Sequence, residues 1–180
     1  MKRSTTLIFL SLSMLLTALP TQAATVILTS NLNALNSAPQ NSSTATGTAL
    51  MNFDDVTNQF NLSIDINGIT TTTLTNSHIH LGASGVNGIV IFPIGTTGWT
   101  NNTSGGMSLG LTGKSFPTAY VADLLAGNTY LNFHTQTFAG GEIRGQLVAV
   151  APVPLPAAAW LLGSGLIGLV GASRKKGARS

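Results

Sequence analysis

The segment FNLSIDI, at Phe60–Ile66, alternates strictly between apolar and polar side chains. Because successive side chains of a β-strand point to opposite faces, this pattern predicts a strand with one face in a core and the other in water. The chain contains no cysteine, so disulfide bonds cannot hold such strands together. Burial of the apolar faces must therefore supply the stability of the fold.

Shorter segments carry strand or turn patterns along the rest of the chain. We expect strands at 48–53, 89–94, 129–134 and 142–150, and one short helix at 118–127, where apolar residues recur at helical spacing. The Gly-rich stretch at 105–113 predicts a loop with a weak strand, and Asn87-Gly88 predicts a turn. About six to eight short strands with one helix indicate an all-β fold, either an antiparallel β-sandwich or a small open barrel.

The N-terminal end has the layout of a secretory signal peptide. Lys2 and Arg3 precede an apolar run at 7–19, and Pro20 separates that run from small residues that favour cleavage. The alternative is an uncleaved anchor, which fits less well because a membrane span needs about 20 apolar residues. We therefore expect export through the inner membrane.

The C-terminal end predicts a membrane anchor. Residues 157–173 carry no charge, and Arg174, Lys175 and Lys176 follow directly. The positive-inside tendency places this basic tail in the cytoplasm and everything upstream outside. A buried core helix is the alternative, but a helix that is apolar on all sides is a poor surface element for a small domain.

A proline-rich motif leads into this span. It is formed by Val153, Pro154, Leu155 and Pro156. The motif cannot continue a helix, because each proline lacks an N–H donor and restricts the residue before it. Together with the small-residue span and the basic end, it resembles the PEP-CTERM sorting signal in its VPLPA variant. The resemblance implies processing by an exosortase, a membrane-embedded cysteine transpeptidase; the alternative is a plain anchor with a stiff linker.

The two ends carry most of the basic charge. Between Ala24 and Pro152 two basic residues, Lys114 and Arg144, stand against five acidic residues, which gives a net charge of −3. We expect no nucleic-acid partner, because phosphate binding needs a basic patch. The chain also lacks a nucleophile elbow, a phosphate loop, a dinucleotide fingerprint and a calcium loop. These absences favour a non-enzymatic domain.

Two histidines, His78 and His80, stand one residue apart in the sequence HIH. In a strand they share one face, with Cα atoms about 6.6 to 7 Å apart, so that their imidazoles can converge on one ion. Pairing with the predicted strand that ends at His134 would add a third nitrogen. Three imidazoles suit zinc, copper or nickel, with Glu142 as the nearest oxygen ligand. A structural role fits these residues at least as well: the histidines would bond backbone carbonyls and fix loops, and we then expect no cofactor.

The block GGEIRGQL, at 140–147, predicts a strand in which Glu142, Arg144 and Gln146 share one face. Glu142 and Arg144 would pair with each other or with aspartates of a neighbouring strand, for at most ~1 kcal/mol if exposed. A catalytic role for Glu142 would need a second acid at a defined distance, and the scattered acidic residues offer no evident partner.

The blocks HIHLGASGVNGIVIFPI and AYVADLLAGNTYLNFHTQTFAGGEIRGQL, at 78–94 and 119–147, resemble the CHRD domain, which is common in microbial secreted proteins. The resemblance extends over about 48–148 and implies an immunoglobulin-like β-barrel with a limited likeness to copper/zinc superoxide dismutases. Those enzymes place copper on a His-x-His pair and a later histidine. The resemblance therefore implies, as the alternative function, a metal-binding or redox domain that uses His78, His80 and His134. The chain has no further histidine to bridge a second metal.

These patterns together predict five segments. They are a signal peptide at 1–23, a CHRD-like β domain at 24–150, a Pro-rich sorting motif and linker at 151–156, a transmembrane helix at 157–173 and a basic tail at 174–180. We expect a surface or extracellular-matrix protein of a Gram-negative bacterium, with exosortase and the membrane as partners during sorting. The β domain would then contact exopolysaccharide or another surface protein.

Overall fold

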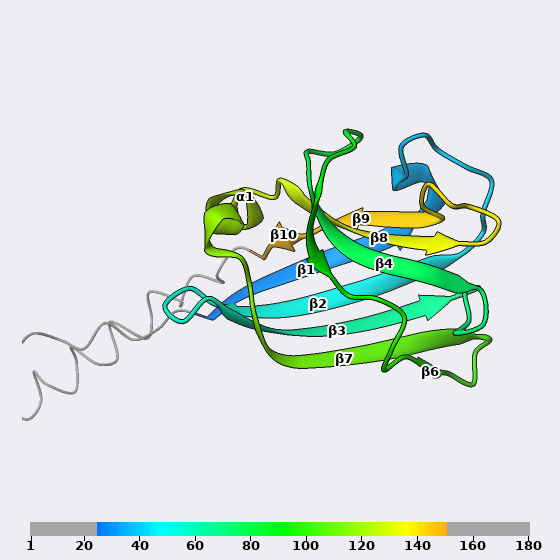
Figure 1. Cartoon of the computed structure of the whole chain (residues 1–180), viewed down its shortest axis with the longest axis horizontal. Helices are drawn as coiled ribbons and strands as arrows, with labels where there is room; N and C mark the ends of the chain where they lie inside the picture. The colour runs from blue at the N-terminus through cyan, green and yellow to red at the C-terminus, as the bar shows by residue number, and fades with distance from the viewer. Residues whose placement is uncertain (1–24, 151–180) are drawn as a thin grey trace, which may run out of the picture.

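Figure 1 shows the computed structural model of the chain, which describes residues 25–150. The signal peptide expected at 1–23, the sorting motif at 151–156, the span at 157–173 and the tail at 174–180 lie outside the described residues. Within residues 25–150, no helix is long and apolar enough to cross a membrane. The described residues all lie within the β domain expected at 24–150.

Ten antiparallel strands form one sheet in this part of the chain. They are β1 (Thr25–Asn33), β2 (Thr46–Asp54), β3 (Gln59–Asn67), β4 (Leu74–Leu81), β5 (Val90–Pro93), β6 (Thr100–Asn101), β7 (Gly106–Ser115), β8 (Thr129–Thr135), β9 (Ile143–Gln146) and β10 (Val148–Ala149). The order along the sheet is β5-β4-β8-β9-β1-β2-β3-β7-β6, and β10 pairs with β1. The expected all-β antiparallel fold is confirmed. Strand β1 and the 3-10 turn η1 (Ala34–Asn36) are elements that the sequence patterns did not predict.

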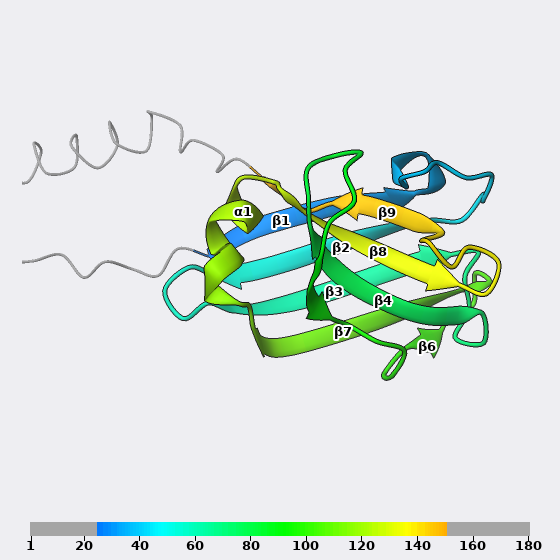
Figure 2. The same cartoon turned by 45° about the horizontal axis from the view of Figure 1, so that its top comes forward.

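The sheet curls so that its two halves face each other. Figures 1 and 2 show β4 and β8 lying across β2 and β3. The ring of Phe60 on β3 lies 5.1 Å from the ring of Phe92 on β5 and 6.1 Å from that of Phe116, measured between centroids. Trp99 and Phe133 meet edge to face at 5.8 Å. Such aromatic contacts fill the space between the halves and remove both inner faces from water.

Strand β3 follows the alternation of its sequence. Phe60, Leu62, Ile64 and Ile66 are each at most 2% exposed, whereas the side chains between them face water. Burying one such side chain contributes ~1.5–3 kcal/mol relative to leaving it exposed. The period-two pattern therefore determines both the strand and the face that it turns to the core.

The Gly-rich stretch, where we expected a loop with a weak strand, forms most of β7, which pairs with β3 along its length. The loop part of this prediction was wrong because glycine, a poor strand former, is required at Gly106 by a close approach. A Cβ atom at Gly106 would lie only 1.8 Å from the carbonyl oxygen of Ile66. The inward side chains Met107 and Leu109 are buried and attach the strand to the core.

Two other elements differ from their expected bounds. In place of one helix at 118–127, a 3-10 turn, η2 (Thr118–Tyr120), leads into a short helix, α1 (Val121–Leu125). The strand expected at 142–150 is divided into β9 and β10, because β9 pairs mainly with β8 whereas β10 pairs with β1. The pair Asn87-Gly88 lies in the loop that joins β4 to β5, not in a two-residue hairpin turn.

Candidate metal centre

Strands β4 and β8 carry the three histidines of the chain. Their antiparallel register sets His78 opposite Asn132, His80 opposite Tyr130 and Asn76 opposite His134. On the other face of these strands, Ile79 and Leu131 are fully buried in the core. The histidines therefore lie on the side turned away from the core, which we call the outer face.

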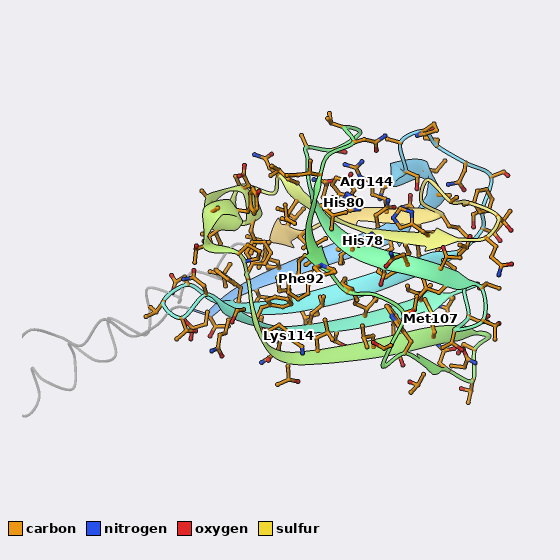
Figure 3. All side chains as sticks on the ribbon, viewed as in Figure 1. His78, His80, Phe92, Met107, Lys114 and Arg144 are labelled. Atoms are coloured by element: carbon orange, nitrogen blue, oxygen red, sulfur yellow. The ribbon has the colours of Figure 1, made fainter. Side chains whose placement is uncertain are left out.

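The three imidazole rings are neighbours on this face. The centroid of the His78 ring lies 5.4 Å from that of His80 and 5.3 Å from that of His134, and the last two rings are 6.2 Å apart. One ring nitrogen from each histidine lies within 4.8 Å of the others. Figure 3 shows His78 and His80 on β4, with Arg144 nearby on β9. Strand pairing thus brings the late histidine to the His-x-His pair.

Backbone carbonyls orient two of the rings. Nδ1 of His80 lies 3.0 Å from the carbonyl oxygen of Gly88, and Nδ1 of His134 lies 2.8 Å from that of Ala139. A carbonyl oxygen only accepts hydrogen bonds, so Nδ1 carries the proton in both rings and Nε2 carries a lone pair. Metal-binding histidines commonly donate their second ring N–H to such an acceptor.

The nitrogen atoms on the other sides of the rings have few partners. Nε2 of His80 and Nδ1 of His78 are buried, and neither has a hydrogen-bond partner in the described part of the chain. Nε2 of His134 lies 3.3 Å from the side-chain amide nitrogen of Asn132. Buried polar atoms are rarely left unpaired, so each exception calls for a water or an ion.

The electrostatic setting favours neutral imidazoles. Burial lowers the pKa of His78, and the neighbouring His134 and His80 lower it further. Burial also lowers the pKa of His80; the hydrogen bond to Gly88 opposes this effect, while His134 and Arg144 reinforce it. Neutral imidazole is the form that binds a metal ion, so the protein environment favours the protonation state of these two side chains that metal binding requires.

A single transition-metal ion fits this donor set. Nitrogens bound to one tetrahedral ion at ~2.0–2.1 Å lie ~3.4 Å apart, whereas those of the cluster are up to 4.8 Å apart. The cluster must therefore contract on binding. Three imidazoles without a thiolate or a carboxylate suit zinc, copper or nickel better than calcium or magnesium.

Glu142, the oxygen ligand expected from the sequence, lies outside this cluster. Its carboxylate accepts hydrogen bonds from the hydroxyl groups of Ser43 at 2.6 Å and Thr135 at 2.5 Å. The carbonyl oxygen of Glu142 accepts from Asn41, at 3.0 Å. Glu142 thus ties the segment before β2 to β8. Its role in the described structure is to join segments.

The ion pair expected between Glu142 and Arg144 is replaced by other contacts. The guanidinium carbon of Arg144 lies 3.3 Å from the centre of the Tyr130 ring, and Nη2 donates to the carbonyl oxygen of Ala83 at 2.8 Å. Glu142 and Arg144 do not pair because they lie in different surroundings. Glu142 precedes β9 and accepts from hydroxyl groups, whereas Arg144 lies within β9 on the outer face. Arg144 is only 2% exposed.

Sequence reasoning missed the groups that orient the histidines. The structural alternative anticipated histidines bonded to backbone carbonyls, but it did not say which carbonyls; the partners are the carbonyl oxygens of Gly88 and Ala139. Every residue has a carbonyl, so residue types cannot mark one as a partner. The signal that was available is the short spacing from each histidine to a Gly-containing loop.

A second feature of the outer surface is a hollow of about 440 Å³ on strands β1 to β3. Polar residues, among them Thr29, Asn31, Thr48 and Asp65, line it together with the apolar Ala49 and Leu50. A neighbouring hollow of about 260 Å³ shares Thr29 and Asn31 with it and reaches Gln146. The two together present neutral hydrogen-bonding groups and one carboxylate beside apolar side chains such as Leu50 and Val148.

Comparison with known proteins gives one match. The family model described as the CHRD domain matches residues 28–147, which include all three histidines and the strands from β2 to β9. No match was found among curated proteins or among solved structures.

Proposed function

Because the chain belongs to the CHRD domain family, we propose that its β domain is a non-enzymatic binding module that holds one copper or zinc ion on His78, His80 and His134. The observation that carries this proposal is the set of three ring nitrogens within 4.8 Å of one another. Leaving a buried polar atom unpaired costs ~1–3 kcal/mol, and His78 and His80 each have one such nitrogen. A bound ion would supply the missing partner.

The residues around the ion would hold it and restrict its movement. A bound ion would supply a Lewis-acidic centre and would cross-link β4 to β8. The carbonyls of Gly88 and Ala139 fix the tautomers of His80 and His134. The chain contains three histidines, so none remains to bridge a second ion, and the proposed site is mononuclear.

The proposed likeness to copper/zinc superoxide dismutases concerns the ligand pattern and the sandwich-like topology. It does not extend to the reaction, because a binding role accounts for the contacts around the histidines without a redox step. A metal-dependent redox reaction therefore remains outside the proposal.

We further propose that the domain works outside the cytoplasm. Support comes from the signal-peptide layout at 1–23, the apolar segment at 157–173 and the basic residues that follow it. The sorting motif Val153–Pro156 would be recognised by an exosortase, which would release or attach the domain at the cell surface or in the matrix. Intact-mass analysis of the protein from its native host tests this route, since a mature form that still ends at Ser180 would refute processing.

The two hollows that meet at β1 offer a surface for exopolysaccharide or another surface protein. Their hydroxyl and amide groups can donate and accept hydrogen bonds with sugar hydroxyls, and the lining contains one acidic side chain, Asp65. Binding of a neutral polysaccharide should be lost when Asn31 and Thr48 are both changed to alanine, and retained when the histidines are changed.

Elemental analysis of the protein isolated from its native host, in the form in which it accumulates there, tests the metal proposal. We expect close to one equivalent of copper or zinc per chain, and loss of that ion in the His78→Ala variant. Asn76→Ala is the matched control, because Asn76 lies on the same strand, is exposed and lies opposite His134. Equal metal content in wild type and His78→Ala would contradict the assigned ligands.

A further inference from the structure

The loop that joins β4 to β5, residues 82–89, lies against His80. We propose that this loop, together with Tyr130 and Arg144, is a positioning layer that presents His80 to a metal ion through Nε2. This inference rests on the proposed metal site. The loop, Tyr130 and Arg144 would act through His80 and would not themselves contact the ion.

A single residue links the loop to both His80 and Tyr130. The carbonyl oxygen of Gly88 receives the Nδ1–H of His80 at 3.0 Å, and the N–H of Gly88 donates to the Tyr130 hydroxyl at 3.1 Å. A Cβ atom at position 88 would lie 1.5 Å from the carbonyl oxygen of Leu81. Only glycine allows the loop to approach β4 this closely. That approach brings the carbonyl within reach of His80.

Tyr130 also contacts His80 directly. The two rings are stacked, with centroids 4.9 Å apart and planes inclined by 10°. Tyr130 therefore holds the face of the imidazole with its ring and, through Gly88, the Nδ1 edge with its hydroxyl group. Its side chain is 1% exposed. Together these contacts restrict both the rotation of the imidazole and the choice of nitrogen that carries the proton.

Arg144 and Gln146 of β9 fix the start of the loop. Nη2 of Arg144 donates to the carbonyl oxygen of Ala83 at 2.8 Å, and the side-chain amide of Gln146 donates to that of Gly82 at 3.0 Å. The Arg144 guanidinium also lies over the Tyr130 ring. The loop is thus held by β9 at residues 82–83 and by Tyr130 at residue 88.

The contacts of Arg144 with the loop and with Tyr130 explain why this cation is buried despite the loss of its hydration. Arg144 is 2% exposed and its Nη1 has no hydrogen-bond partner among the described residues. Burying a cation is unfavourable unless other contacts compensate for the lost water. Its contacts with Tyr130 and Ala83 hold the loop in place.

The Tyr130→Phe variant tests the positioning layer, because it keeps the stacked ring and removes the acceptor of the Gly88 N–H. We expect the Cu(II) affinity of the full chain to fall by about 10–100-fold, as is typical when a metal ligand loses an outer partner. Competition with a chromogenic chelator measures this change. Tyr120→Phe is the matched control, since Tyr120 is the other tyrosine of the chain and lies on η2; its affinity should equal that of wild type.

A second measurement separates positioning from general stability. In the metal-free protein, ¹⁵N NMR should find His80 protonated at Nδ1 in wild type and in Tyr120→Phe, but in a mixture of tautomers in Tyr130→Phe. If Tyr130→Phe does not fold, Arg144→Lys serves instead, since lysine keeps the charge but lacks the planar group that covers Tyr130.

The possible results distinguish the two proposals. A folded variant with unchanged Cu(II) affinity and an unchanged His80 tautomer would overturn the positioning layer, although the metal site would stand. A wild-type chain that binds no ion would overturn the proposed function and this inference with it. Weaker binding in Tyr130→Phe alone, accompanied by a mixed tautomer, is the result that supports both.

Discussion

The imidazole rings of His78 and His134 lie edge to face, with centroids 5.3 Å apart, on two strands that pair antiparallel. The contact depends on the β4–β8 register, because a slip of one residue would turn a side chain to the other face of the sheet. That register is held by the apolar side chains on the opposite face, where Ile79, Leu131 and Phe133 are fully buried. The candidate site and the core therefore depend on the same strand pairing.

Acid should destabilise the metal-free domain. Burial lowers the pKa of His78 and of His80 below 6.5, so the unfolded chain binds protons at a higher pH than the folded domain does. The contribution of these two neutral histidines to the free energy of unfolding is then fully present above pH 6.5. It decreases as the pH falls through that value toward the lower pKa of each group in the folded domain. Urea midpoints, measured with a chelator present at about pH 7.5 and about pH 5.5, check this dependence.

The control for this experiment is His78→Gln, which should show a weaker dependence on pH than wild type. Asp54 also has a lowered pKa, caused first by the backbone N–H of Thr57 and then by that of Val56, but its ordinary value is 3.8. Its contribution is lost only in more acid solution. A midpoint that stayed constant over the tested range would contradict the burial of neutral imidazoles.

Changing Glu142 to alanine should affect stability but not metal content. The variant leaves the Ser43 and Thr135 hydroxyl groups without their shared acceptor, at an expected cost of ~1–3 kcal/mol in the free energy of unfolding. Chemical denaturation measures the cost and a metal titration measures the stoichiometry. Asp65→Ala, at an exposed position on β3, is the control and should change neither quantity. Loss of the bound ion in Glu142→Ala would show that this carboxylate is a ligand after all.

Two glycines of β7 should respond differently to alanine. At Gly106 the new Cβ atom would lie 1.8 Å from the carbonyl oxygen of Ile66, whereas at Gly110 no atom of the described structure lies within 4 Å. Gly106→Ala should therefore lower the free energy of unfolding by about 2–3 kcal/mol, and Gly110→Ala should leave it within about 0.5 kcal/mol of wild type. Equal urea midpoints for the two variants would contradict the pairing of β3 with β7.

The sequence predicted the strands whose side chains alternate most clearly. Phe60–Ile66 is the best case, since every second residue is apolar and each of those is buried in β3. It failed at β7, because the glycine that permits close contact with β3 also gives the segment the composition of a loop. The amino-acid composition of a segment reflects intrinsic conformational preferences. The requirement for glycine at position 106 comes instead from the short distance to β3, which composition does not contain.

The candidate metal site also has a part that could be predicted from the sequence and a part that could not. That His78 and His80 share a face follows from the geometry of any strand, and His134 joins them because β8 pairs with β4. The stacking of Tyr130 on His80, and the placing of Arg144 over Tyr130, could not be predicted. Both depend on three strands lying in the order β4-β8-β9, which is a property of the whole sheet.

Titration of the metal-free full chain with Cu(II) and Zn(II) tests the central claim most directly. We expect saturation at one equivalent of one of these ions and a higher thermal midpoint in its presence, since a ligand at ~100 times its Kd stabilises the folded state by ~2.7 kcal/mol. His78→Ala and His134→Ala should lose both effects while keeping a cooperative unfolding transition. Absence of stoichiometric binding, with a thermal midpoint that neither ion changes, would contradict the account.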